Sequence, residues 1–316
     1  MKKNILVSIC MVSYNHEKWI GQAIEGVLRQ ETAFPFELVI GEDCSTDGTK
    51  EIIQAFSNKY PSVIRAFYNR GNIGLSDNFS QLLNKCHGKY IAICEGDDFW
   101  TDPNKLQKQV EFLEANPECV ICSHNCSILY DTDNHLSHDF QHTKNLQFDQ
   151  KRFLQEWITQ PLTCVFRNIF CDYRLFNKEK DIFCDVILFY ELLKHGTGYF
   201  MADNMATFRL HKSALSSGLS NQDWLHNHII MFDYLYKHNQ RDKLLLQISR
   251  KYCLSLYIYK LSSGSIEGFH FKPLQEYYKR TPGFLEGVFT TFVRVPYYVL
   301  RHGLLSKVKS MITDGF

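Results

Sequence analysis

No stretch of this sequence reaches about 18 uninterrupted apolar residues, the length of a membrane-spanning helix, so we expect no transmembrane segment. Neither sign of charge is in clear excess, because the sequence contains 35 lysines and arginines and 34 aspartates and glutamates. This balance excludes the strongly basic surface of a nucleic-acid-binding domain. The chain also lacks internal repeats and low-complexity tracts. With 45% apolar residues among 316, it can bury a sizeable core and is predicted to be globular.

Paired cysteines at metal-binding spacing are missing as well. Eleven cysteines are present, but no C-x-x-C pair is matched by a second pair or by suitably spaced histidines. The close pair Cys119 and Cys122 lies in an alternating run, where regular alternation sends the two side chains to opposite faces of a strand. The other cysteines lie singly in apolar segments. We therefore expect buried, reduced thiols and a reducing, cytoplasmic compartment.

The N-terminus lacks the small-residue cleavage pattern of a signal peptide. Its apolar run 5–12 follows two lysines, but polar residues 13–17 come directly after it. We interpret the run as a buried first strand.

From the N-terminus to about Cys126, short apolar runs alternate with amphipathic segments. Strands are expected at 5–12, 36–40, 63–67, 90–94 and 119–122, and helices at 18–30, from about 47, at 78–86 and after Pro103. Strands separated by helices indicate parallel pairing with right-handed crossovers. The predicted fold class is α/β, a doubly wound, mostly parallel sheet flanked by helices.

The second half of the chain is less regular. Residues 131–150 are polar and are interpreted as a loop. A strand is expected at 162–166, a helix around 187–193, a turn at Gly196-Thr197-Gly198, and strand-like segments at 199–201 and 205–208. After Gly218 the pattern is helical without strands. We therefore predict an α/β domain over 1–217 and a helical region over 218–316.

The stretch Glu95-Gly96-Asp97-Asp98 places adjacent carboxylates at the end of an apolar, strand-like run. Ligands of open α/β sheets bind outside the carboxyl ends of the strands, so these acids can face a bound phosphate. Two negative groups need a cation there, and Mg²⁺ or Mn²⁺ prefers oxygen ligands of this kind. The alternative is a solvated turn before a helix that is capped by Asp102, with Pro103 in its first turn.

Two further loops follow the first and second predicted strands. The first carries Ser13 and Tyr14, and the second carries Asp43 before the run 44–49. A carboxylate such as Asp43 suits the imide N–H of a base such as uracil, and a tyrosine ring can stack on a base. The residues at 45–48 also fit ordinary turn and capping chemistry.

Taken together, these motifs resemble inverting family 2 glycosyltransferases of the GT-A fold, of the bacterial surface-polysaccharide type. The matching stretches are 7–15, 42–49, 72–74, 95–98 with Trp100, and Pro103-Lys105-Leu106-Gln109, with a weaker continuation through Asp185 and 208–211. They cover about the first two fifths of the chain in order and spacing. The sequence departs from the family at Val12, Glu42 and Cys184. Because of the departure at Cys184, Asp181 is an alternative to Asp185 as the counterpart of the family's catalytic base.

The resemblance implies a role for each matching position in donor binding. Asp43 would accept from the base of a nucleoside diphosphate sugar, beside Ser13 and Tyr14. Asp97 would contact the ribose or the sugar, and Arg209 would close over the diphosphate.

The resemblance also implies a metal and a catalytic base. Asp98 would be the direct ligand of Mn²⁺ or Mg²⁺, and His211 would complete the metal shell. Asp185 aligns with the base that removes the acceptor proton, although it also fits a helix N-cap, and His211 also fits a plain strand-end histidine. Direct displacement with such a base inverts the anomeric carbon and needs no second, nucleophilic carboxylate.

The expected function is transfer of a hexosyl or N-acetylhexosaminyl group from a nucleoside diphosphate sugar to a glycan or lipid-linked acceptor. A UDP-sugar is the first candidate for the donor. A nucleotidyltransferase is disfavoured because 12–17 is not a glycine-rich, basic loop. A non-catalytic sugar-binding or scaffold protein on the same fold stays open.

The aromatic and basic tail 283–316 suits a membrane surface or packing against the rest of the chain or a partner. A homo-oligomer stays open too. The expected location is the cytoplasm, including the inner face of the plasma membrane.

Overall fold

The computed structural model describes residues 5–131, 133–137, 142–156, 158–173, 184–214, 220–239, 242–245 and 247–249. The chain divides into two compact units, Met1–Gly218 and Leu219–Phe316. The rival base Asp181 and the tail 283–316 lie outside the described residues.

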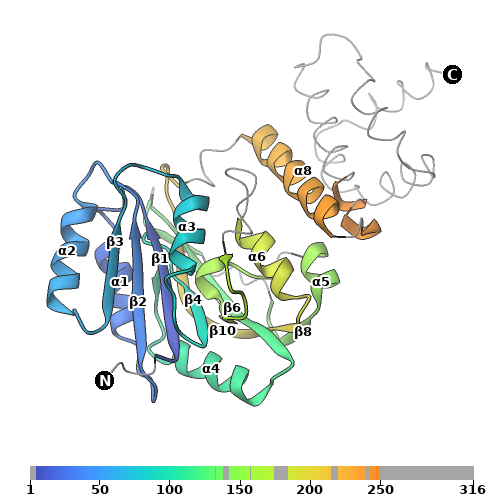
Figure 1. Ribbon diagram of the computed structural model, residues 1–316, viewed down its shortest axis with the longest axis horizontal. Coiled ribbons are helices and arrows are strands. Elements are labelled where there is room, and N and C mark those ends of the chain that lie inside the picture. The colour runs from blue at the N-terminus through green and yellow to red at the C-terminus, as the bar shows by residue number, and fades with distance from the viewer. Residues whose placement is uncertain are drawn as a thin grey trace, which may run out of the picture. The chain divides into compact units, whose positions relative to one another are not determined.

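The first unit is built on a ten-stranded sheet in the order β3-β2-β1-β4-β9-β6-β10-β5 (Figure 1). The parallel half consists of β1 (Val7–Ser13), β2 (Phe36–Glu42), β3 (Ile64–Tyr68) and β4 (Tyr90–Ile93). The mixed half contains β5 (Phe99–Trp100), β6 (Cys119–Tyr130), β9 (Val165–Arg167) and β10 (Thr197–Leu210). Two short strands, β7 (His135–Ser137) and β8 (Leu146–Phe148), pair with β6 and β10. The α/β class with a flanked central sheet is confirmed.

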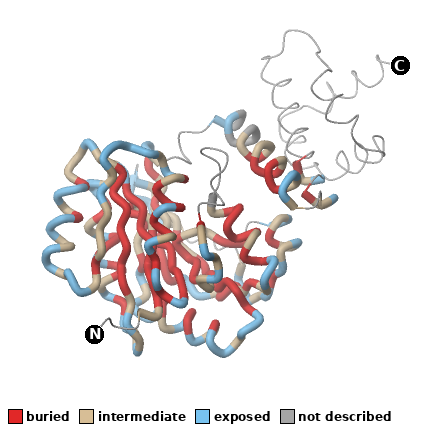
Figure 2. The backbone as a smooth tube through the Cα atoms, viewed as in Figure 1, coloured by how far each residue is buried: buried red, intermediate tan, exposed pale blue. Residues whose placement is uncertain are grey.

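The helices of the first unit are α1 (Ile20–Leu28), α2 (Thr49–Lys59), α3 (Leu75–Leu83), α4 (Lys105–Ala115), α5 (Gln150–Gln155) and α6 (Cys184–Leu192), with a 3₁₀ turn at Pro161–Thr163. Figure 2 shows the central strands β1, β2 and β4 almost wholly buried, with exposed residues on the outer faces of the helices. The second unit contains α8 (Asn221–His238), which begins with a capping box between Ser220 and Asp223.

Four local predictions were wrong. Thr197 and Gly198 of the expected turn at 196–198 belong to β10, and the expected loop 131–150 contains β7 and β8. Asp102 does not cap α4: its Oδ1 accepts a hydrogen bond from the amide of Asn104, and the helix begins at Lys105. Cys119 and Cys122 belong to one buried cluster, because a register irregularity where β6 pairs with the start of β10 interrupts strict alternation.

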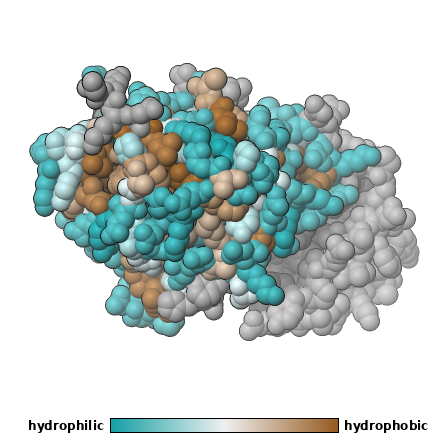
Figure 3. Space-filling view, turned by 90° about the horizontal axis from the view of Figure 1, so that it is seen from below, coloured by the Kyte–Doolittle hydropathy of each residue, from teal (hydrophilic) through white to brown (hydrophobic). Residues whose placement is uncertain are grey.

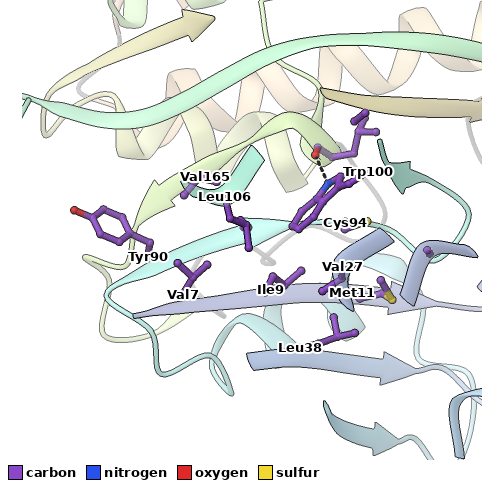
Figure 4. Packing of buried hydrophobic residues seen from close by; sticks show 14 of the residues in the cluster. Val7, Ile9, Met11, Val27, Leu38, Tyr90, Cys94, Trp100, Leu106 and Val165 are labelled. Atoms are coloured by element: carbon purple, nitrogen blue, oxygen red, sulfur yellow. Dashed lines mark hydrogen bonds between the residues drawn. The ribbon is translucent and has the colours of Figure 1, made fainter. Parts of the chain in front are cut away.

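Trp100 lies at the centre of the buried cluster (Figure 4). Its indole nitrogen donates to the main-chain oxygen of Leu162 at 2.9 Å. The ammonium of Lys105, itself fully buried, lies 4.0 Å from the ring centroid and donates to Gln109 Oε1 at 2.8 Å. Burial lowers the pKa of Lys105 to about 8. These contacts fix the position of the chain directly after the acidic motif.

The surface drawn in Figure 3 is mostly hydrophilic, with hydrophobic residues in small separate groups. Among the helices described here, none combines the length and apolar character needed to cross a bilayer.

Helix α1 lies against the backbone of β5 at a glycine. A Cβ on Gly26 would come within 3.0 Å of the main-chain oxygen of Trp100 and 3.1 Å of its nitrogen. A Cβ on Gly21, in the same helix, would meet nothing closer than a Phe56 ring atom at 4.0 Å. Of the two glycines of α1, Gly26 is therefore required by packing and Gly21 is not.

We expect Gly26→Ala to lower the free energy of unfolding by about 1–3 kcal/mol, because backbone cannot move aside as a side chain can. The matched variant Gly21→Ala should be neutral or stabilising by about 0.5–1 kcal/mol, since alanine favours helix. Urea denaturation followed by tryptophan fluorescence measures both. Equal stability of the two variants would contradict the close approach.

Candidate active site

The acidic motif is held at the carboxyl end of β1. The amide of Cys94 donates to Cys10 O at 3.1 Å, and the amide of Gly96 donates to Val12 O at 3.0 Å. The motif thus continues the pairing of β4 with β1 beyond the end of the strand. Its aspartates lie at the edge of the sheet where ligands of α/β proteins bind.

Arg209, near the end of β10, donates two hydrogen bonds to the motif. Its amide donates to Asp98 Oδ1 at 2.7 Å, and its Nε donates to the main-chain oxygen of Asp97 at 2.9 Å. The guanidinium also donates to Gln22 Oε1 at 2.6 Å and lies 3.9 Å from a carboxylate oxygen of Asp131. Arg209 is therefore buried and engaged within the protein, where it positions both aspartates.

The Asp97 carboxylate faces two imidazoles. His211 Nε2 lies 3.0 Å from Asp97 Oδ2, and His16 Nε2 lies 3.6 Å from the same oxygen. On its other side, His211 Nδ1 lies 2.9 Å from Ser213 Oγ. The ring of His211 packs on Trp19, with centroids 3.9 Å apart. These contacts orient the His211 ring with Nε2 toward the aspartate.

Three carboxylates crowd this site and their pKa values differ. Burial, then the charge of Asp97, raises the pKa of Glu95, and the same two causes raise the pKa of Asp98 well above its usual range. Burial acts to raise the pKa of Asp97 too, but the hydrogen bond from His211 and the charge of His16 outweigh it and the pKa is lowered. Asp97 is therefore the carboxylate of the motif whose pKa is lowered, while the pKa values of Glu95 and Asp98 are raised.

The donor set fits a divalent cation that is only partly held by protein. Within the part of the chain that the structure describes, no three His, Cys, Asp or Glu side chains form a ready-made metal site. Asp98 Oδ2 is buried and makes no hydrogen bond to another described residue. Mg²⁺ and Mn²⁺ commonly take one or two carboxylates and complete their shell with substrate phosphates and water. A cation would also offset the crowded negative charge.

The absence of a side chain at Gly96 leaves space for two polar atoms of the site. A Cβ on it would come within 2.8 Å of His16 Nδ1 and 3.0 Å of Ser13 Oγ. Both of these polar atoms are buried without a hydrogen-bond partner among the described residues. Any larger residue at position 96 would displace them.

The predicted base-binding loops are tied to each other. The amide of Asn15 donates to Ser45 Oγ at 3.0 Å, and the amide of His16 donates to Thr49 Oγ1 at 2.8 Å. Asn15 and Cys44 adopt positive φ angles of 55° and 60°, which mark tight, specific loop conformations. Tyr14 is 41% exposed, so a ring face is available for stacking.

Asp43 is 2% exposed and is engaged within the protein. It accepts hydrogen bonds from Asn69 Nδ2 at 2.8 Å, the Ile73 amide at 3.0 Å and the Gly74 amide at 2.9 Å. Asp43 therefore organises the loop before α3.

Asp185 lies in the first turn of α6 and is partly buried. Burial raises its pKa to about 6, and its charge contributes to the raised pKa of Glu95. A carboxylate with a pKa near neutrality suits a general base.

The structure brings together Ser13, Asp97, Asp98, Arg209 and His211, but it pairs them differently from the sequence prediction. His211 faces Asp97, whereas Asp98 accepts from the backbone of β10. Sequence reasoning missed His16, Ser213 and Gln22. Of these, His16 had a signal, because it directly follows Tyr14-Asn15 at the end of the first strand.

The family model for glycosyl transferase family 2 matches residues 8–179, more than half of the chain. The uncharacterized protein Rv1520 of Mycobacterium tuberculosis is 43% identical over 125 residues, which cover 40% of this chain and 36% of that protein. The chain therefore matches only about a third of that relative's length. The putative teichuronic acid biosynthesis glycosyltransferase TuaG of Bacillus subtilis is 29% identical over 214 residues, covering 67% of this chain and 82% of TuaG.

Among solved structures, residues 1–349 of TarS from S. aureus in complex with UDP-GlcNAc superpose with a TM-score of 0.58. The superposition covers 79% of this chain and 72% of that one at 16% identity, so it speaks to the fold alone. The matched family model, the central sheet and this likeness agree. The chain belongs to glycosyl transferase family 2 and has its GT-A fold.

Proposed function

We propose that this protein is a metal-dependent, inverting glycosyltransferase. It moves a hexosyl or N-acetylhexosaminyl group from a nucleoside diphosphate sugar to a hydroxyl of a glycan or lipid-linked acceptor. A UDP-sugar is the first candidate for the donor. The observation that carries the proposal is the Asp97 carboxylate facing two imidazoles at the carboxyl end of β1. The relative TuaG, described as a putative teichuronic acid biosynthesis enzyme, supports a surface polysaccharide as the product.

The metal, Mn²⁺ or Mg²⁺, is proposed to bind Asp97 and His211. Asp98 was the first choice from sequence and keeps an unpartnered Oδ2 among the described residues, but His211 faces Asp97 rather than Asp98. If Ser213 Oγ accepts the Nδ1 proton of His211, the Nε2 lone pair is free for the cation. When bound, the cation neutralises the diphosphate that leaves.

The nucleotide is proposed to lie on the loops that follow β1 and β2. Tyr14 offers its exposed ring to the base, and Ser13 lies beside the motif. Asp43 already accepts three hydrogen bonds, and a carboxylate has about four acceptor positions, which leaves about one for an imide N–H. Arg209 is proposed to position Asp97 and Asp98 rather than to touch the diphosphate.

Asp185 is proposed as the general base. As the acceptor oxygen attacks the anomeric carbon, its proton passes to the Asp185 carboxylate and the nucleoside diphosphate departs from the opposite face. One displacement inverts the anomeric configuration, and no covalent glycosyl-enzyme intermediate forms.

Residues 1–217 are proposed as the catalytic domain, and 218–316 as the region that contacts the acceptor, a second copy or the membrane surface. The aromatic and basic residues after Gly283 would bring a cytoplasmic enzyme to a lipid-linked acceptor.

The ligand assignment is tested by calorimetric titration with UDP and Mn²⁺. We expect UDP binding by the wild type to require the metal, and Asp97→Asn to weaken it by at least about tenfold. The matched variant Asp98→Asn keeps an oxygen for the Arg209 amide and should weaken binding less. Loss of binding only in Asp98→Asn would return the metal to Asp98. Absence of binding to UDP, GDP or their sugars would contradict the proposed function.

The role of Asp185 is tested by its pH profile. Below a pKa of about 6 the carboxylate is protonated and cannot accept the acceptor proton. The value of kcat/KM should therefore fall about tenfold for each pH unit below that pKa and level off above it.

Asp185→Asn should lower kcat by about 10²–10⁴-fold with UDP binding unchanged. The matched control Asp149→Asn also replaces an acid at the start of a helix, α5, and should retain activity. If Asp185→Asn is as active as that control, Asp185 serves only as a helix-starting residue.

Membrane contact is tested by liposome flotation of protein with and without residues after Gly283. We expect the full chain to float with vesicles that contain anionic lipid, because cationic and aromatic side chains favour that surface. Equal flotation of the two proteins would contradict a role for the tail.

A further inference from the structure

His16 is a second imidazole at the Asp97 carboxylate, and it comes from a different part of the chain than His211. The two Nε2 atoms lie 3.6 Å and 3.0 Å from the same oxygen, Asp97 Oδ2. The two rings stand nearly perpendicular, at 84°, with centroids 6.4 Å apart. Two nitrogen atoms and one carboxylate oxygen thus converge on one small volume.

No hydrogen bond to a described residue holds either nitrogen of His16. Its Nε2 lies 3.6 Å from Asp97 Oδ2, which is too long for a hydrogen bond. Its Nδ1 is buried and has no partner among the described residues. Nε2 is therefore the His16 nitrogen that is open to a ligand at Asp97, whereas Nδ1 lies on the side of Gly96.

The spacing suits a shared cation. Ligands at about 2.1 Å from one ion lie about 3.0 Å apart in an octahedral shell and about 3.4 Å apart in a tetrahedral one. The His211 to Asp97 separation of 3.0 Å equals the first value, and the His16 to Asp97 separation of 3.6 Å slightly exceeds the second. To share one octahedral ion with Asp97 and His211, His16 Nε2 needs to approach Asp97 Oδ2 by about 0.6 Å, which no hydrogen bond to described residues opposes.

We propose that His16 is the third protein ligand of the cation, so that the centre is His16, Asp97 and His211. This inference rests on the proposed function and extends it to the choice of metal. Imidazole nitrogen suits transition metals better than Mg²⁺, which prefers oxygen. His16 thereby makes the site selective for Mn²⁺, with Co²⁺ as a competent substitute, and UDP oxygens and water fill the remaining positions.

The test compares wild type, His16→Gln, His211→Gln and the exposed control His135→Gln, each saturated with UDP. Calorimetry measures the affinity for Mn²⁺ and for Mg²⁺, and electron spin-echo envelope modulation counts the nitrogens bound to Mn²⁺. Removing His16 should weaken Mn²⁺ by about 10–100-fold and Mg²⁺ by less than about threefold. Wild type and the control should show two bound nitrogens, and either active-site variant should show one.

A single nitrogen in the wild type, unchanged in His16→Gln, would overturn the inference while metal-dependent UDP binding upholds the proposed function. An equal loss of Mn²⁺ and Mg²⁺ affinity in His16→Gln would also overturn it, because it would indicate a change in loop structure. Failure of the wild type to bind UDP with any metal would instead contradict the proposed function itself.

Discussion

The candidate site depends on the two hydrogen bonds that Arg209 donates to the pair Asp97-Asp98. The Arg209 amide holds the Asp98 carboxylate, and its side chain holds the main-chain oxygen of Asp97. These contacts join segments separated by more than 100 residues in sequence. Because His211 directly follows β10, two residues after Arg209, the same contact places the imidazole at Asp97. One strand end thus organises both aspartates and their nitrogen neighbour.

The different roles of Asp97 and Asp98 follow from their contacts with Arg209. Asp98 is buried, accepts a backbone hydrogen bond and has a raised pKa, all of which favour a structural role. Asp97 is kept ionised by His16 and His211, which favours ligand binding. Concentrated negative charge costs stability in the free protein, and active sites commonly retain such a cost because a bound ligand offsets it.

The core supports this arrangement from below. Trp100 follows the motif by two residues and is fixed by Leu162, by the Lys105 ammonium and by the close approach of Gly26. The carboxylates therefore lie next to a segment that is held by contacts with Leu162, Lys105 and Gly26. Rigid support of this kind is what a site needs to hold reacting groups in place.

The sequence by itself determined the α/β class, the parallel strands β1 to β4 and the motif Glu95 to Asp98, because buried strands and amphipathic helices carry strong local patterns. It also indicated Asp185 and the segment 208–211 through resemblance. Only the tertiary structure decided that His211 and His16 face Asp97 rather than Asp98, and that Arg209 is buried. Register irregularities in β10 and contacts between distant segments fix these pairings, and neither leaves a local signature in the sequence.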